Sequence, residues 1–191
     1  MMAQPNLRDA ILASGLETLH RKGFNATSVQ DIAEAAGAPK GSFYNHFSSK
    51  EELGAAAVEA YAAKMDQLSL LQDKTVAPLA RLRRHFVALA EAARYPYDCG
   101  CLLGNFGAEL SGQSPLIRER VESALAHWTK ALAAVVEEAQ REGALPRDRD
   151  PKTLASFVID CWEGAVLRAK VERDRAPLDA FLAITFSKVL A

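Results

Sequence analysis

The sequence predicts an all-α protein in which a small N-terminal domain of three helices precedes a larger helical domain, with about nine helices in total. Three observations support this prediction. Apolar residues recur at spacings of three and four along most of the 191 residues, and no segment alternates as a strand would. Glycines and prolines stand where those periodic segments end. With 49% hydrophobic and 25% charged residues, the chain can bury a sizeable core.

The first predicted helix runs over residues 7–22, with Asn6 available as its N-cap and Gly23 after its end. Its inward face is apolar and consists of Leu7, Ile11, Leu12, Leu16 and Leu19. We expect this helix to act as a scaffold for the next two.

Two short helices separated by a turn follow. Thr27 and Gln30 form a predicted capping box that opens the first of them, and Gly37 ends it. The second spans residues 38–47, with Pro39 at the first helical position. A short turn that contains glycine between two such helices is typical of the DNA-binding helix-turn-helix. An ordinary helical hairpin is the alternative.

The outer face of the second short helix favours DNA binding over a buried hairpin. Phe43 and Phe47 stand four residues apart and form its inward anchor, and we expect them to meet Phe24 in a core. No acidic residue occurs over residues 35–50, so a polyanion meets no repulsion there. The candidate DNA-contacting residues are Thr27, Ser28, Lys40, Gly41, Ser42, Tyr44, Asn45, His46 and Lys50.

Four stretches of this region carry a resemblance to a known family: Lys22–Phe24, Thr27–Gly37, Lys40–Phe47 and Ser49–Leu53. Together they look like the N-terminal domain of the TetR family of one-component regulators. The resemblance implies a DNA-binding domain over residues 1–49 and an effector-binding and dimerisation domain over residues 50–191. It also implies a homodimeric transcriptional repressor that a small-molecule inducer releases from a palindromic operator.

The second domain opens with a long predicted helix that Ser49 and Glu52 cap and that continues to about Gln72. Ser114 and Asp150 are the predicted N-caps of two later helices, each followed by proline. The further helices are predicted over residues 79–93, where Arg94–Pro96 brings the helix to a stop, and over 115–143, 151–173 and 177–190.

The most informative stretch of the second domain is residues 97–110, which is rich in glycine for a helix. Gly100, Gly104 and Gly107 follow at spacings of four and three, so we expect a bare helix face that is packed inside. Cys101 is expected in the first turn, where the helix N-terminus lowers the pKa of a thiol.

This stretch resembles a branch of the TetR family in which a Gly-Cys-Leu helix lies beside the effector pocket. In some members of that branch the cysteine senses electrophiles or oxidants, and a basic residue accompanies it; Lys170 falls at that place here. The effector candidates are Cys101, Asn105, Trp128 and Lys170, with Tyr97, Phe106 and His127 as further pocket walls. Cys101 could instead be a small buried hydrophobe. The inducer could be a covalent electrophile or a noncovalent lipophilic molecule.

The last two predicted helices each carry a wide apolar stripe. One consists of Leu154, Phe157, Val158, Cys161, Trp162, Ala165 and Val166, and the other of Leu178, Phe181, Leu182, Thr185, Phe186 and Val189. Pairing of two such hairpins in a four-helix interface would form the homodimer that a palindromic operator requires. The alternative is that both stripes pack on their own subunit.

Several function classes are disfavoured. We find no catalytic residue set and no cofactor motif, so we expect no enzyme, and His20 and His46 lack partners at metal-ligand spacing. The net charge of −1 permits DNA binding if the basic residues share one face. We expect no signal peptide, no membrane span, reduced cysteines and a cytoplasmic location. A helical thiol-redox or ligand-binding protein without DNA binding is the alternative class.

Overall fold

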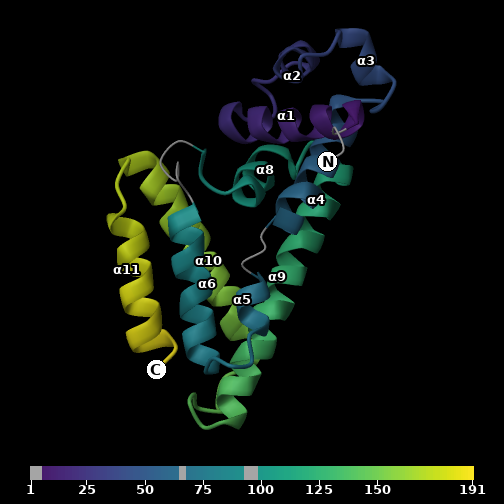
Figure 1. The fold of residues 1–191 in the computed structure, drawn as a ribbon. Coiled ribbons are helices and arrows are strands. Elements are labelled where there is room, and N and C mark those ends of the chain that lie inside the picture. The colour runs from purple at the N-terminus through teal and green to yellow at the C-terminus, as the bar shows by residue number, and fades with distance from the viewer. Residues whose placement is uncertain (1–5, 65–67, 93–98) are drawn as a thin grey trace. The chain divides into compact units, whose positions relative to one another are not determined.

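The computed structural model describes residues 6–64, 68–92 and 99–191. These residues contain helices and no strands, which confirms the all-α prediction (Figure 1). Ten α-helices and a final π-helical segment are assigned in them, close to the nine helices predicted. The α-helices are α1 (Leu7–Lys22), α2 (Val29–Ala35), α3 (Lys40–Tyr44), α4 (Lys50–Lys64), α5 (Leu68–Gln72), α6 (Pro78–Ala92), α8 (Leu102–Leu110), α9 (Pro115–Arg141), α10 (Pro151–Glu172) and α11 (Ala176–Ile184), and the π-helix η1 is Thr185–Val189.

The described residues group into two compact units. The first unit holds α1 to α4, α8 and the beginning of α9 up to residue 124. The second unit holds α5, α6, α10, α11 and η1, with α9 from residue 125 onward and the segment that ends at Cys101. None of the helices within the described ranges is long and apolar enough to cross a bilayer.

Helix α1 forms as predicted. The side chain of Asn6 accepts a hydrogen bond from the backbone N–H of Asp9 at 2.9 Å, which satisfies one donor of the first turn. Ile11, Leu16 and Leu19 are buried as expected. Leu7 is exposed instead, because it is the first residue of the helix and lies beyond the buried part of that face.

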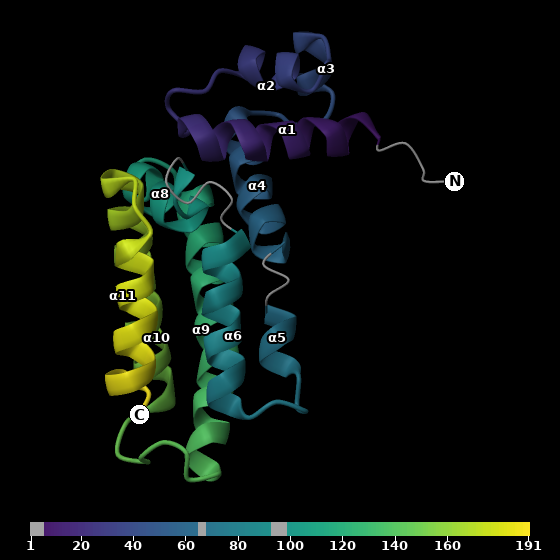
Figure 2. The same ribbon diagram turned by 60° about the vertical axis from the view of Figure 1, so that its left-hand side comes forward.

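Helices α1 and α4 pack closely at a glycine. A Cβ atom on Gly15 would lie 2.7 Å from a methyl carbon of Leu53, so a larger residue would push α4 away from α1. In Figure 2, α2 and α3 lie together on one side of α1. These helices form the core of the first unit with Ile11, Leu19, Ile32, Phe43 and Leu53, and Phe47, which follows α3, is buried with them.

The predicted N-cap of α2 is wrong by one residue. Ser28, not Thr27, is the cap: its hydroxyl accepts from the backbone N–H of Asp31 at 3.1 Å, and the Asp31 carboxylate accepts from the N–H of Ser28 at 2.8 Å. The carboxylate of Asp31 makes a charge-assisted bond that the amide of Gln30 could not match. Thr27 is 1% exposed, and its hydroxyl donates to the carbonyl of Gly23.

The turn between α2 and α3 ends α2 at Gly37 as predicted. Gly37 has φ of +64°, which favours glycine, and its N–H donates to the carbonyl of Glu34 at 3.0 Å. The N–H of Ala38 donates to the carbonyl of Ala33 at 2.9 Å, which completes a Schellman motif.

Helix α3 is shorter than the ten residues predicted for it. Pro39 has an extended ψ of 142° and is the N-cap, so the prediction of Pro39 as the first helical residue is wrong by one position. After Tyr44 the backbone continues as a turn in which the N–H of Phe47 donates to the carbonyl of Phe43 at 2.9 Å.

The capping of α4 follows half of the predicted pattern. The Ser49 hydroxyl accepts from the N–H of Glu52 at 3.0 Å, as predicted. The Glu52 carboxylate, however, accepts from the N–H and the hydroxyl of Ser48, both at 2.7 Å, because Ser48 offers two donors. The single helix predicted from Ser49 to Gln72 corresponds to α4 and α5, and residues 65–67 lie outside the described residues.

Two later N-caps in the chain are confirmed. The Ser114 hydroxyl accepts from the N–H of Ile117 at 3.1 Å, and the Asp150 carboxylate accepts from the N–H of Thr153 at 2.7 Å. The predicted stop at Arg94–Pro96 lies outside the described residues. The last predicted helix is divided between α11 and η1.

An aromatic cluster forms the centre of the second unit. The ring of Phe86 in α6 lies 6.2 Å from Trp128, 5.4 Å from Trp162, 5.1 Å from Phe181 and 6.4 Å from Phe186. These residues come from α6, α9, α10, α11 and η1, so the cluster joins the main helices of the unit.

The apolar stripe predicted for α10 packs mostly within its own unit. Leu154, Val158, Trp162, Ala165 and Val166 are all buried there, because this face of α10 meets α11 and the aromatic cluster. The prediction that the whole stripe faces a second subunit is therefore wrong for these residues.

Candidate DNA interface and sensing site

The outward face of α3 is exposed and carries no acidic side chain. Lys40, Gly41 and Asn45 are exposed, and Tyr44 is 54% exposed although its ring contacts Phe43 at 5.2 Å. A large aromatic side chain held at the surface in this way suits contact with a ligand.

The inward face of α3 is anchored by aromatic rings. Phe43 and Phe47 are buried with their ring centroids 5.8 Å apart, which confirms the predicted anchor. The guanidinium of Arg8 lies 5.0 Å from the ring of Phe47. Phe24 contacts Phe106 of α8 instead of joining them, so that part of the prediction is wrong.

The remaining candidate residues of the first unit are half-buried, buried or engaged in capping. Ser42 and His46 are half-buried, and the side chain of Thr27 does not reach the surface. The hydroxyl of Ser28 donates to Asp31 at 2.5 Å while Ser28 caps α2. The predicted DNA-contacting residues that the fold brings together are therefore those on the exposed face of α3: Lys40, Gly41, Tyr44 and Asn45.

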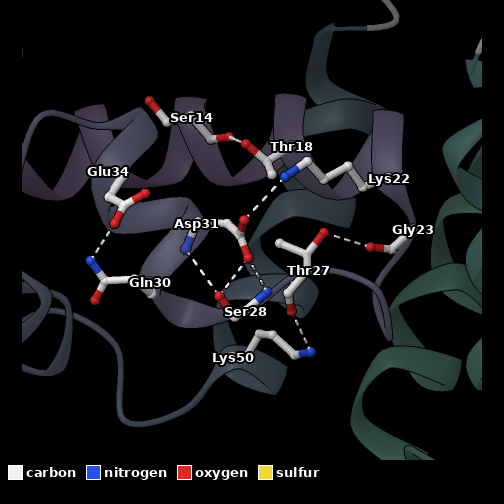
Figure 3. Close-up of polar contacts among 10 residues, drawn as sticks. All are labelled: Ser14, Thr18, Lys22, Gly23, Thr27, Ser28, Gln30, Asp31, Glu34 and Lys50. Atoms are coloured by element: carbon white, nitrogen blue, oxygen red, sulfur yellow. Dashed lines mark hydrogen bonds and ion pairs between the residues drawn. The ribbon is translucent and has the colours of Figure 1, made fainter.

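Asp31 organises the polar network at the start of α2 (Figure 3). Its carboxylate accepts from the N–H and the hydroxyl of Ser28 and forms an ion pair with Lys22 at 3.1 Å. The hydrogen bonds from Ser28, and then that from Lys22, hold the pKa of Asp31 well below its usual range. Lys22 thus compensates the negative charge of Asp31 at the start of α2.

Lys50 holds the loop between α1 and α2. Its ammonium donates to the carbonyls of Phe24 at 2.9 Å and Thr27 at 2.8 Å, and it lies 4.2 Å from the centroid of the Phe24 ring. Burial lowers the pKa of Lys50, and the charge of Glu109 opposes that shift. Two of its three donors are thus used inside the protein.

Glu109 holds the same loop from the other side. Its carboxylate accepts from the backbone N–H groups of Phe24 at 3.0 Å and Asn25 at 2.7 Å. Phe106, three residues earlier in α8, meets the Phe24 ring edge-on at 6.0 Å. Sequence reasoning missed Glu109, although it is the one charged residue of an apolar helix, which is a signal for a specific partner.

Cys101 lies directly before α8 and is 8% exposed. The prediction of this residue in the first turn is therefore wrong by one position, because the helix begins at Leu102. All three cysteines are present as thiols.

The thiol of Cys101 has a carboxyl partner that sequence reasoning missed. Glu163 of α10 forms a side-chain hydrogen bond with Cys101. Burial raises the pKa of Glu163, and the bond from Cys101 opposes that shift. The sequence did contain a signal for this residue. Glu163 stands four residues after Ile159 and three before Val166, both buried on α10, so its carboxyl is on the same side of the helix as buried apolar residues.

The other effector candidates lie in different places. Trp128 is buried, and its indole N–H donates to Nε2 of His85 at 2.9 Å. Lys170 is half-buried on α10 of the second unit, whereas Asn105 is half-buried on α8 of the first. His127 is exposed, so the interpretation of it as a pocket wall is wrong.

Two further expectations concern the glycine-rich stretch. Gly104 is exposed, so the prediction that the whole glycine face is packed inside is wrong at this position, in the first turn of α8. Tyr97 lies outside the described residues.

Comparison with known families adds to this geometry. Residues 78–185 match the model of the tetracyclin repressor-like C-terminal domain, and residues 11–57 match that of the bacterial regulatory proteins of the tetR family. The chain belongs to the TetR family. Members of the TetR family are DNA-binding transcriptional regulators and not enzymes, and they form dimers.

Curated TetR-type relatives match over most of their length. The chain is 38% identical over 191 residues to the HTH-type transcriptional repressor DhaR of Mycobacterium sp. strain GP1, covering 99% of this chain and 95% of that protein. It is 41% identical over 178 residues to the transcriptional regulator AcuR of Cereibacter sphaeroides, covering 90% and 80%.

Solved TetR-family structures share the fold. A regulatory protein TetR from Rhodobacter sphaeroides superposes with a TM-score of 0.88 at 38% identity, covering 95% of this chain and 97% of that one. The reduced form of NemR from Escherichia coli superposes with a TM-score of 0.84 at 28% identity, covering 94% of each. The chain is therefore a DNA-binding regulator of the repressor type that these TetR relatives represent.

Proposed function

We propose that this TetR-family regulator binds a palindromic operator as a cytoplasmic homodimer and leaves it when a small inducer acts on residues 50–191. The exposed face of α3 supports the operator contact. Lys40, Gly41, Tyr44 and Asn45 are exposed there, and we propose that Lys40 binds a phosphate while the other three face the groove. We propose Ser28, Ser42 and His46 as further DNA contacts.

The homodimer would form through a second face of α10 and through α11. Phe157, Gly164, Leu167 and Val171 are exposed at helical spacing along α10, with Val171 75% exposed and Phe157 51% exposed. Ile184 of α11 is exposed as well. Exposed apolar side chains in one stripe are what a C₂ helix interface covers.

The observation that carries the sensing proposal is the position of Cys101. This buried thiol directly precedes α8, and α8 carries the Glu109 carboxylate that holds the loop between α1 and α2. An adduct on Cys101 would displace the start of α8, and Glu109 would then pull on the loop that precedes α2. We therefore propose a reactive electrophile as the inducer, and we propose Lys170, which the family resemblance pairs with this cysteine, as a further sensing residue.

A gel-shift titration on the upstream intergenic DNA, with and without N-ethylmaleimide, tests this proposal when it is followed by intact-mass analysis. We expect the electrophile to release the DNA and one adduct to map to Cys101. Cys101→Ser should abolish the release. Cys161→Ser is the matched control, because burial and then the charge of Asp160 raise the pKa of the Cys161 thiol and slow its alkylation. Equal release by both variants would remove Cys101 as the sensor.

A noncovalent lipophilic inducer is the second candidate. The aromatic side chains around Phe86 and the buried hydrogen bond between Trp128 and His85 support it, because lipophilic ligands bind among apolar and aromatic side chains with few polar groups. Retention of DNA binding by fully alkylated protein would favour this candidate.

A further inference from the structure

Arg8, the second residue of α1, is a charged residue that is not among the predicted DNA contacts. Its side chain is exposed, and its guanidinium carbon lies 5.0 Å from the centroid of the Phe47 ring. Phe47 is 1% exposed and comes three residues after the end of α3. The start of α1 thus places a positive charge beside the end of the helix that we propose for the operator contact.

The contact with Phe47 leaves the hydrogen-bond donors of Arg8 unused. Among the residues that the structure describes, Arg8 makes no hydrogen bond and no ion pair. A cation–π contact uses the positive charge of the guanidinium and none of its five N–H donors. The aromatic ring therefore holds this side chain while its donors stay available to a ligand.

The acidic residue on which the charge of Arg8 acts has other hydrogen-bond partners. The Glu52 carboxylate accepts from the N–H and the hydroxyl of Ser48, both at 2.7 Å. These hydrogen bonds lower the pKa of Glu52, and the charge of Arg8 lowers it further. Glu52 therefore interacts with Arg8 through charge alone and does not occupy its donors.

We propose that Arg8 binds a backbone phosphate of the operator beside the end of α3. This inference rests on the proposed operator contact of α3 and adds a residue of α1 to it. A phosphate can accept two parallel N–H bonds from one guanidinium, a geometry that a lysine does not offer. Because Phe47 holds the guanidinium before DNA arrives, less side-chain entropy is lost on binding. A phosphate contact carries no sequence information, so Arg8 would fix the position of α3 on the duplex.

A purely bracing role for Arg8 predicts a different result. If the guanidinium only covers the Phe47 ring, its loss would loosen the end of α3 and weaken binding, but the number of neutralised phosphates would stay the same. The slope of log affinity against log salt concentration reports that number. The salt slope thus separates a phosphate contact from a brace.

The first experiment measures affinity for the upstream intergenic DNA by fluorescence anisotropy at several salt concentrations. In Arg8→Met an unbranched side chain can still cover Phe47, but the charge is gone. We expect affinity to fall by about tenfold, as for a lost charge-assisted hydrogen bond. The salt slope of the dimer should fall by about 1.8, since each phosphate contributes about 0.9. Arg118→Met, at an exposed position of α9, is the matched control and should keep both wild-type values. An unchanged slope in Arg8→Met would overturn the proposal.

Lys40→Ala, measured in parallel, separates this inference from the proposed function. A lower slope in Lys40→Ala together with a wild-type slope in Arg8→Met would refute the role of Arg8 and leave the α3 interface in place. Wild-type affinities and slopes in both variants would reject the α3 interface and the Arg8 contact together.

A second measurement uses the unaltered protein and so does not depend on the folding of a variant. Arginines are modified with p-hydroxyphenylglyoxal, with and without saturating operator DNA, and the modified sites are mapped by peptide mass. We expect the operator to slow modification of Arg8 several-fold and to leave that of Arg118 unchanged. Equal modification of Arg8 in the free and the DNA-bound protein would contradict a phosphate contact.

Discussion

The Oε1 atom of Glu109 lies 2.7 Å from the backbone nitrogen of Asn25, although the two residues are 84 positions apart in the chain. A carboxylate of α8 thereby fixes the loop that leads into α2, and it also accepts the neighbouring N–H of Phe24. Charge-assisted bonds to backbone donors position a loop more firmly than neutral contacts do.

We predict that Glu109→Ala destabilises the first unit by about 2 kcal/mol, because two charge-assisted hydrogen bonds are lost. Operator affinity should fall by about tenfold as the loop before α2 loosens. Glu119→Ala, an exposed acidic residue on α9, is the matched control and should alter neither property. Thermal melting and fluorescence-anisotropy titration on DNA measure the two effects. Unchanged affinity in Glu109→Ala would show that the loop position does not depend on this carboxylate.

Lys50→Met should lower stability by roughly 2 kcal/mol, because the carbonyls of Phe24 and Thr27 lose a charged donor. Operator affinity should weaken, but the slope of its salt dependence should stay the same if Lys50 acts by holding the loop. Titrations at several salt concentrations measure that slope. A smaller slope would assign the third donor of Lys50 to a DNA phosphate.

Lys40→Ala should instead weaken operator binding without loss of stability, because its side chain is exposed on α3. Each lost phosphate contact reduces the salt slope by about 0.9, so a dimer should lose about 1.8. Tyr44→Ala should weaken binding as well and leave the slope unchanged. The exposed Lys152 of α10 provides the control variant Lys152→Ala, for which we expect wild-type binding. If Lys40→Ala binds the operator with wild-type affinity at the same salt concentration, Lys40 does not contact DNA.

Local sequence signals predicted the helices of this protein well, because caps act within one turn. Asn6, Ser114 and Asp150 are the N-caps that the sequence indicates. The error at Thr27 and Ser28 arose because both side chains carry hydroxyl groups, and spacing alone cannot decide which hydroxyl faces the helix.

The partners of the candidate site could not be predicted in the same way. Glu109 accepts a hydrogen bond from Asn25, and Glu163 accepts one from the Cys101 thiol. In both pairs the two residues are far apart in the chain, so no local sequence pattern connects them. Tertiary packing also decided that Phe24 meets Phe106 rather than the rings of α3. Family resemblance indicated a cysteine and a lysine, whereas the carboxyl partner of Cys101 emerged only from the fold.

Leu167→Glu on the exposed face of α10 should dissociate the homodimer, because the proposed interface would bury a charge without a partner. The monomeric variant should remain folded, since Leu167 lies outside the core of its own unit. Lys152→Glu introduces an acidic side chain near the start of the same helix and should leave the dimer intact. Sedimentation equilibrium measures the assembly state. If the Leu167→Glu variant is still a dimer, the interface does not include this face of α10.

Glu138 should make the second unit sensitive to acid. Arg81 is only 1% exposed; it donates to the carbonyl of Leu71 at 2.9 Å and pairs with Glu138 at 2.7 Å, and Lys74 pairs with the same carboxylate. These hydrogen bonds, from Arg81 first and then Lys74, lower the pKa of Glu138 from 4.5 to about 2. A carboxyl whose pKa is lowered by folding stabilises the native state above its unfolded pKa, and that contribution is lost as the pH falls.

We therefore predict that Glu138→Gln lowers the unfolding free energy by about 2 kcal/mol at neutral pH, since it leaves the buried Arg81 charge without its partner. The difference from the wild type should shrink as the pH falls from 4.5 toward 2, where the wild-type carboxyl is also protonated. Denaturation followed by tryptophan fluorescence reports on this unit, because both tryptophans, Trp128 and Trp162, belong to it. The neighbouring exposed residue supplies the control Glu137→Gln, which should match the wild type throughout. A difference that persists at the lowest pH would mean that packing, and not the ion pair, is what Glu138 contributes.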